Sequence, residues 1–104
     1  MATLAGAVVT KLRPAVIIES EGYLRERPDV LLGILTSKMP FRMASTDYAL
    51  KDWQAAGLKL ESCFRVFVNT MARSEITVIG RLTERDWAKV KECTGRAFAL
   101  LGPG

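Results

Sequence analysis

Residues 11–20 have the sequence KLRPAVIIES. The continuous, mostly β-branched run from Ala15 to Ile18 predicts a short buried strand, and Pro14 at its first position removes only an N–H that an entering strand can spare. Arg13 lies directly before this strand. Its guanidinium is either a solvated surface group or a fixed set of donors for an anion, and the strand by itself leaves both interpretations open.

A second apolar run, VLLGILTS at residues 30–37, predicts another core strand, which ends in the hydroxyl residues Thr36 and Ser37. Neighbouring strands joined by a charged loop commonly pair antiparallel, so the start of the first would lie beside the end of the second. Arg13 and Thr36 would then share one rim of the sheet. A fork of N–H donors beside two hydroxyls is a suitable cradle for a phosphodiester.

The rest of the chain is predicted to be mainly β with one closing helix. Thr83 is expected to cap an amphipathic helix that ends near Leu101, and Gly57 to end a single helical turn. Further strands are predicted within TDYAL (46–50), SCFRVFVNTMA (62–72) and SEITVIGRL (74–82). This order of elements favours an α+β fold that is mainly β, a small, bent barrel of antiparallel strands with a C-terminal helix.

Two residues of the predicted helix are expected to have packing roles. Gly95 weakens a helix interior, so a close neighbour is expected there. Trp87 is expected to pack, whereas Trp53 and Tyr48 are left open between packing and base stacking.

Length and charge limit the class of protein. The 104 residues fit one domain, residues 1–104, and a hydrophobic fraction of 49% favours an oligomer, most simply a homodimer. Fifteen Lys and Arg against 11 Asp and Glu give a formal charge of +4, which suits a polyanionic or acidic partner. No apolar stretch approaches the roughly 20 residues that cross a bilayer, so a cytoplasmic protein without a membrane partner is expected.

The absence of histidine excludes several kinds of chemistry. A chain with no histidine cannot build a Ser-His-Asp or Cys-His triad or a histidine metal centre. Cys63 and Cys93 lie far apart in sequence and outside any CxxC motif, so two free, structural thiols are expected. Neither a metal site nor a cofactor is predicted.

Five motifs in order resemble the MazF/PemK family, the toxins of type II toxin–antitoxin modules. They are RPAVIIES (13–20), VLLGILTS (30–37), TDYALKDWQAAGL (46–58), FRVFV (64–68) and IGRLTERDWAKV (79–90), so the resemblance extends over about residues 11–101. It implies an SH3-like small barrel, a homodimer and metal-independent cleavage of single-stranded RNA such as mRNA. It also implies an antitoxin whose acidic, disordered segment covers the active groove.

The resemblance further implies roles for individual residues. The arginine of the family's RP motif corresponds to Arg13 and the threonine of its TS motif to Thr36, and these are the expected catalytic residues. Arg13 would neutralise charge on the scissile phosphate while the Thr36 hydroxyl hydrogen-bonds a phosphoryl oxygen. The attacking group would be the ribose 2′-hydroxyl of the RNA itself. The residues expected to bind RNA are Lys11, Ser37, Arg65, Arg25 and Arg27, although the last two lie in a loop of alternating charge that is otherwise typical of a solvated surface.

Two departures from the family pattern favour an alternative function. Some family members have an acidic residue two positions after the arginine that corresponds to Arg65, where this chain has Phe67. The family's long first strand and loop are also reduced here. LAGAVV (4–9) is either a shortened strand or no strand at all, and we expect the second. Without this strand, a sheet edge would be left open. The alternative is a non-catalytic or degenerate module of the MazF/CcdB kind that binds an antitoxin or a target protein such as gyrase.

Overall fold

The structure is a computed structural model, which describes residues 6–10, 13–18, 29–38 and 43–101. Within these residues the chain forms six strands, one 3-10 turn and one long helix. In chain order they are β1 (Ala7–Thr10), β2 (Pro14–Ile17), β3 (Asp29–Thr36), β4 (Tyr48–Ala49), β5 (Cys63–Ala72), η1 (Arg73–Glu75), β6 (Thr77–Arg81) and α2 (Glu84–Leu101).

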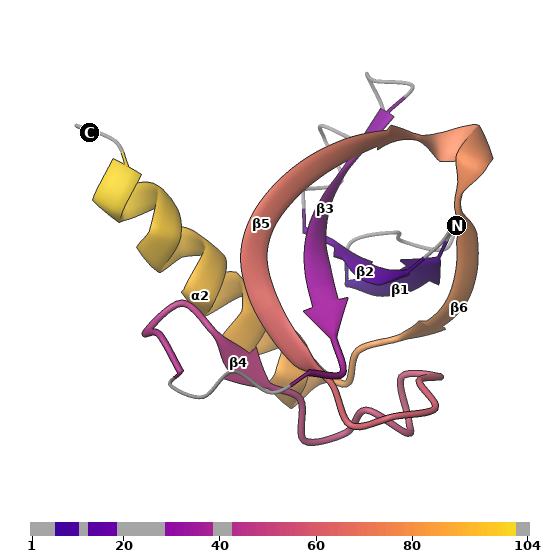
Figure 1. The fold of residues 1–104 in the computed structure, drawn as a ribbon, viewed down its shortest axis with the longest axis horizontal. Helices are drawn as coiled ribbons and strands as arrows, with labels where there is room; N and C mark the ends of the chain where they lie inside the picture. The colour runs from indigo at the N-terminus through magenta and orange to yellow at the C-terminus, as the bar shows by residue number, and fades with distance from the viewer. Residues whose placement is uncertain (1–5, 11–12, 19–28, 39–42, 102–104) are drawn as a thin grey trace.

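The strands form one antiparallel sheet in the order β4-β5-β3-β2-β1-β6. Figure 1 shows the sheet curved into most of a ring, with β5 as a long arc and α2 outside it, against β4 and β5. Among the described residues, β4 and β6 remain the two edges, so the ring is not closed. The predicted mainly β fold, with antiparallel strands and a C-terminal helix, is confirmed.

The expectation that no strand precedes Arg13 is wrong. β1 lies inside the sheet and pairs with β2 on one side and β6 on the other. Its residues Ala7, Val8 and Val9 are all buried, because a strand with a neighbour on each edge and side chains packed on both faces has little contact with water. LAGAVV is therefore the shortened strand that was the other interpretation.

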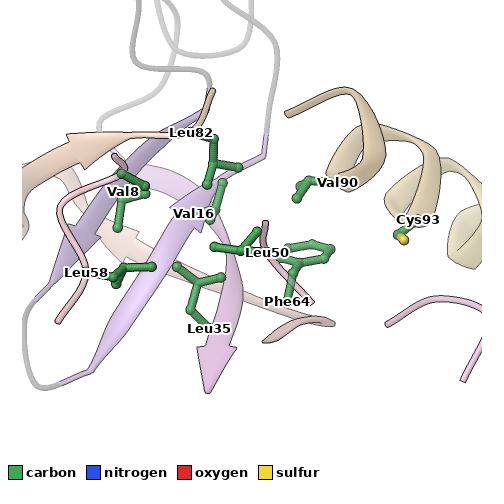
Figure 2. Close-up of a cluster of buried hydrophobic side chains, with 10 residues drawn as sticks. Val8, Val16, Leu35, Leu50, Leu58, Phe64, Leu82, Val90 and Cys93 are labelled. Carbon is green, nitrogen blue, oxygen red and sulfur yellow. The ribbon is translucent and has the colours of Figure 1, made fainter. Parts of the chain in front are cut away.

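The core consists of two clusters on opposite faces of the sheet. Successive residues of β1 and β2 alternate between them, as the pleat of a strand requires. The larger cluster also includes residues of α2 and of the segment before β5 (Figure 2): Val8, Val16, Leu35, Leu50, Ala56, Leu58, Phe64, Leu82, Val90 and Cys93. The smaller consists of Ala7, Val9, Ala15, Ile17 and Leu32.

The pairing of β3 with β5 is irregular at Gly33. The β3–β5 register shifts between Leu32 and Ile34, which shows a bulge in the ladder. A Cβ on Gly33 would lie 2.4 Å from a ring carbon of Phe64, and Phe64 is completely buried. The aromatic ring therefore occupies the space that any other side chain at position 33 would need.

Gly57 ends the predicted helical turn. The N–H of Leu58 donates to the carbonyl of Trp53 at 3.1 Å, and the N–H of Gly57 donates to the carbonyl of Gln54, also at 3.1 Å. With a φ of 89° at Gly57, these bonds form a Schellman cap. The backbone of this turn lies directly on β6, because a Cβ on Gly80 would be 2.0 Å from the Ala56 carbonyl oxygen.

The expectations for α2 have mixed outcomes. Trp87 packs as predicted, since its ring lies 3.1 Å from the position of a Cβ on Gly6. Trp53, which lies outside α2 in the turn that Gly57 ends, also packs against the larger cluster. The expected packing contact at Gly95 is wrong, because a Cβ there would meet nothing within 4 Å and the residue is exposed.

Candidate active site

Arg13 and Thr36 lie at the same rim of the sheet. β2 and β3 pair antiparallel with Ala15 opposite Ile34, which confirms the predicted pairing. Extending this register by two residues brings Arg13 level with Thr36. Arg13 is exposed and Thr36 is half-buried, so both are at a surface where a large substrate can reach them.

The hydroxyl of Thr36 is oriented by its own chain. Its Oγ1 accepts a hydrogen bond from the backbone N–H of Lys38 at 3.2 Å. A hydroxyl that accepts through a lone pair still has its O–H to donate. Thr36 can therefore donate to a phosphoryl oxygen. Ser37 and Lys38, which follow it, are both exposed.

Arg65 is near this rim, but a carboxylate already holds its guanidinium. It lies on β5 opposite Ile34 and on the same face as Thr36, which is two residues further along β3. Its Nε is 3.5 Å from Oδ1 of Asp47, whose side chain is only 4% exposed, whereas that of Arg65 is 48% exposed. The other Asp47 oxygen accepts the N–H of Ala44 at 3.0 Å. Arg65 thus fixes the 43–47 loop and keeps part of its guanidinium in solvent.

A pocket of about 450 Å³ opens near the paired ends of β2 and β3, but on the other face of the sheet, because its lining residue Leu35 belongs to the larger cluster, whereas Thr36 is the next residue along the strand. Pro14 and Ser37 both line it, which is independent evidence that the two strand ends meet. The opposite wall is the segment of residues 57–62, and Ile79 of β6 contributes as well. Most of the lining is aliphatic, with hydroxyl groups and one lysine among it.

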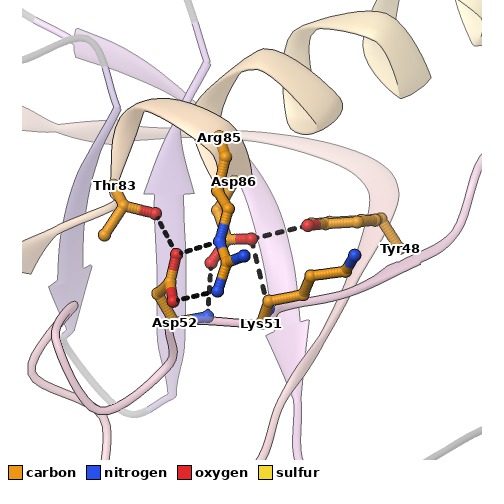
Figure 3. Close-up of polar contacts among 6 residues, drawn as sticks. All are labelled: Tyr48, Lys51, Asp52, Thr83, Arg85 and Asp86. Carbon is orange, nitrogen blue, oxygen red and sulfur yellow. Dashed lines mark hydrogen bonds and ion pairs between the residues drawn. The ribbon is translucent and has the colours of Figure 1, made fainter.

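A buried carboxylate on α2 holds residues 51 and 52, in the turn that precedes this wall. Asp86 is completely buried and accepts three hydrogen bonds, from the Tyr48 hydroxyl at 2.6 Å, the Lys51 N–H at 3.1 Å and the Asp52 N–H at 2.8 Å (Figure 3). It thereby satisfies donors at the start of the 51–57 turn. Burial, together with the hydrogen bond to Asp86, raises the pKa of Tyr48.

Asp52 makes the reciprocal contacts to α2. Its carboxylate accepts hydrogen bonds from Arg85 Nε and Nη2 and from the Thr83 hydroxyl, each at 2.6 Å (Figure 3). These bonds from Arg85 and then Thr83 lower the pKa of Asp52 to about 2. The two carboxylates therefore join the 51–57 turn to the helix in both directions.

The cysteines are free and buried, as predicted. Burial raises the pKa of both thiols, Cys63 and Cys93, so neither has the thiolate character of a nucleophile. In the part of the chain that the structure describes, no three side chains of the metal-binding types are grouped together. The helix within those residues is not long and apolar enough to span a membrane.

The other predicted site residues have different outcomes. Lys11, Arg25 and Arg27 lie outside the described residues. Phe67 is within β5, at the position where a family acid was considered. Sequence reasoning missed Lys59, which lines the pocket, because only the folded chain brings the 57–62 segment to the ends of β2 and β3.

Sequence comparisons give no relative, since no family model and no curated protein match this chain. Its fold is similar to solved structures. A mycobacterial endoribonuclease in complex with its cognate antitoxin has a TM-score of 0.75 at 22% identity, over 98% of this chain and 100% of that chain. The Mycobacterium tuberculosis toxin MazF-mt6 has a TM-score of 0.71 at 21% identity, over 89% and 96%. A MazE–MazF complex from Deinococcus radiodurans has a TM-score of 0.74 at 16% identity, over 96% of this chain and 99% of that chain. The chain therefore has a MazF-like fold.

Proposed function

We propose that the protein is the toxin of a toxin–antitoxin module, a single-domain endoribonuclease that cuts single-stranded RNA in the cytoplasm without a metal ion. The observation that carries the proposal is the β2–β3 register, which brings Arg13 level with Thr36 at an exposed rim. It is supported by the similarity of the fold to structures described as endoribonucleases.

The proposed chemistry needs no histidine. The ribose 2′-hydroxyl loses its proton to solvent and attacks the adjacent phosphorus. The bond to the 5′ oxygen breaks as that oxygen takes up a proton from solvent, and the products end in a 2′,3′-cyclic phosphate and a 5′-hydroxyl. Arg13 stabilises the charge that develops on the phosphoryl oxygens, and the O–H of Thr36 donates to one of them. Arginine keeps its proton at neutral pH, so Arg13 acts as a cation and not as a base.

The test is incubation of a long single-stranded RNA with purified protein in EDTA. We expect cleavage with 5′-hydroxyl ends, and a loss of about a hundredfold or more in Arg13→Ala and in Thr36→Val, since each removes a donor to the transition state. Thr36→Ser keeps the hydroxyl and should retain most of the activity. Lys89→Ala is the control, because it removes an exposed cation of α2 that lies away from the rim. RNA left intact by folded wild-type protein would refute the nuclease.

An antitoxin with an acidic segment is the proposed protein partner, and a homodimer the proposed assembly. Several of the similar structures contain an antitoxin, and the charge of +4 suits an acidic segment. Exposed Val78, Ile79 and Leu60 supply apolar surface for association. Co-expression with a small acidic protein from a neighbouring reading frame, followed by gel filtration, tests both.

A non-catalytic module is the second candidate, and Phe67 favours it because an acid–base group is missing from β5 at that position. A folded protein that binds the antitoxin or gyrase, and leaves RNA intact, is the outcome that distinguishes this candidate from the nuclease.

A further inference from the structure

Thr36 shares its face of the sheet with two residues of β5. It pairs with Cys63, and Arg65 is two residues further along β5, so the three side chains are on one face. On the other side of Thr36, the β2–β3 register brings Arg13 level with it. The face that carries the proposed cleavage residues therefore continues onto β5, where Arg65 supplies a second exposed guanidinium.

The guanidinium of Arg65 is held by a carboxylate that is itself fixed. The side chain of Asp47 is only 4% exposed, and its Oδ1 is 3.5 Å from Nε of Arg65. Its Oδ2 accepts the N–H of Ala44 at 3.0 Å, and its own N–H donates to the Ala44 carbonyl, also at 3.0 Å. Arg96 on α2 donates from Nη1 to the Ser45 carbonyl at 2.6 Å. Because the loop has these other attachments, the buried carboxylate is the rigid member of the pair.

The ion pair leaves part of the guanidinium for a ligand. Asp47 engages Nε, and the remaining N–H donors of the fork are on the two Nη atoms. The Arg65 side chain is 48% exposed, so a substrate phosphate can reach it. A long side chain that is already held in one orientation loses less conformational entropy when a ligand binds. The carboxylate can therefore favour phosphate binding without touching the phosphate.

We propose that Asp47 is a positioning residue, which holds Arg65 for contact with a phosphate that flanks the scissile one. This inference rests on the proposed nuclease function and adds to it a residue that acts through another. A simple count of charges predicts the opposite effect, because a carboxylate near bound RNA repels the phosphates. The direction in which RNA affinity changes when the carboxylate is removed therefore decides between the two.

Asp47→Asn is the test variant, because its amide oxygen can still accept the N–H of Ala44 while the charge that holds Arg65 is lost. We expect the KM for RNA to rise about fivefold, since one long side chain becomes free, with a smaller change in kcat. Glu84→Gln is the matched control, because it removes one negative charge from an exposed position in the first turn of α2. It should not raise the KM.

Arg65→Gln shows whether Asp47 acts through the guanidinium. Glutamine removes the cation but keeps an N–H that can donate to the buried carboxylate, and circular dichroism checks that each variant is folded. We expect Arg65→Gln to raise the KM about tenfold, the loss of a charge-assisted contact with one phosphate. Asp47→Asn added to this variant should raise the KM no further. A purely structural role of Asp47 would raise it by the same factor in both backgrounds.

A second readout does not need cleavage. Oligonucleotides with 2′-deoxyribose lack the attacking hydroxyl and cannot be cut by the proposed reaction, and fluorescence anisotropy measures their binding. We expect Asp47→Asn to weaken binding about fivefold. Unchanged or tighter binding in Asp47→Asn would overturn the positioning role, whether or not RNA is cut. Wild-type protein that binds the oligonucleotide through Asp47 and Arg65 but never cuts RNA would support the positioning role and overturn the nuclease.

Discussion

Gly80 and Gly95 show how differently two glycines can contribute to one small fold. A Cβ at Gly80 would lie 2.0 Å from the carbonyl oxygen of Ala56, which belongs to the backbone and cannot rotate away. Gly95 is in the interior of α2 and has nothing within 4 Å. The first glycine permits a backbone contact, whereas the second only lowers helix propensity.

Gly80→Ala is therefore expected to destabilise the protein by about 2 kcal/mol or more, because either β6 or the 51–57 turn has to move. Gly95→Ala is expected to stabilise it by about 1 kcal/mol. Urea denaturation followed by circular dichroism measures both. Equal effects of the two substitutions would contradict the backbone contact.

Between elements, several hydrogen bonds join the 51–57 turn to the first turn of α2. If Asp86 becomes Ala, the N–H groups of Lys51 and Asp52 and the hydroxyl of Tyr48 lose their acceptor. Unsatisfied buried donors are costly, so we expect a loss of about 3 kcal/mol for Asp86→Ala and about 1 kcal/mol for Tyr48→Phe. In a double-mutant cycle the two losses should not add. Simple additivity would show that the bond from Tyr48 to Asp86 contributes nothing.

The second carboxylate of this connection predicts an acid-dependent loss of stability. The pKa of Asp52 falls from 3.8 to about 2 on folding, so its contribution is present above about pH 4 and is lost as the pH falls toward 2. Urea midpoints measured from pH 5 to pH 2.5 should decrease less in Asp52→Asn than in wild type. Glu61→Gln, which removes a carboxylate outside this connection, should retain the wild-type slope.

The elements were largely predictable from sequence, and their polar connections were not. Apolar runs of β-branched residues located β2 and β3, and their antiparallel pairing brought Arg13 to Thr36. β1 was misjudged because Ala7, Val8 and Val9 form a run too short to show its two strand neighbours. Asp86 looked like an ordinary acid in the first turn of a helix. Its partners at positions 48, 51 and 52 are more than thirty residues away in sequence, a distance over which local pattern gives no information.

At the scale of the whole molecule, the charge of +4 means that the proposed RNA binding should weaken as the salt concentration rises. For single-stranded nucleic acids, the slope of the logarithm of the binding constant against the logarithm of the salt concentration is about −0.7 for each phosphate neutralised. Lys59→Ala should therefore reduce that slope by about 0.7. Lys89→Ala should leave it unchanged, because Lys89 is on α2 and pairs with Glu92 at 3.3 Å. Anisotropy titrations with an uncleavable oligonucleotide at several salt concentrations give the slopes, and equal slopes for both variants would remove Lys59 from the interface.

The contact of the Gly57 turn with β6 has a consequence for engineering and for evolution. The turn is held by backbone contacts and by the carboxylates near α2, and none of these involves the three exposed residues that follow, Lys59, Leu60 and Glu61. Their side chains can therefore be exchanged while the base of the segment stays in place. A saturation library at positions 59–61 should contain mostly folded proteins.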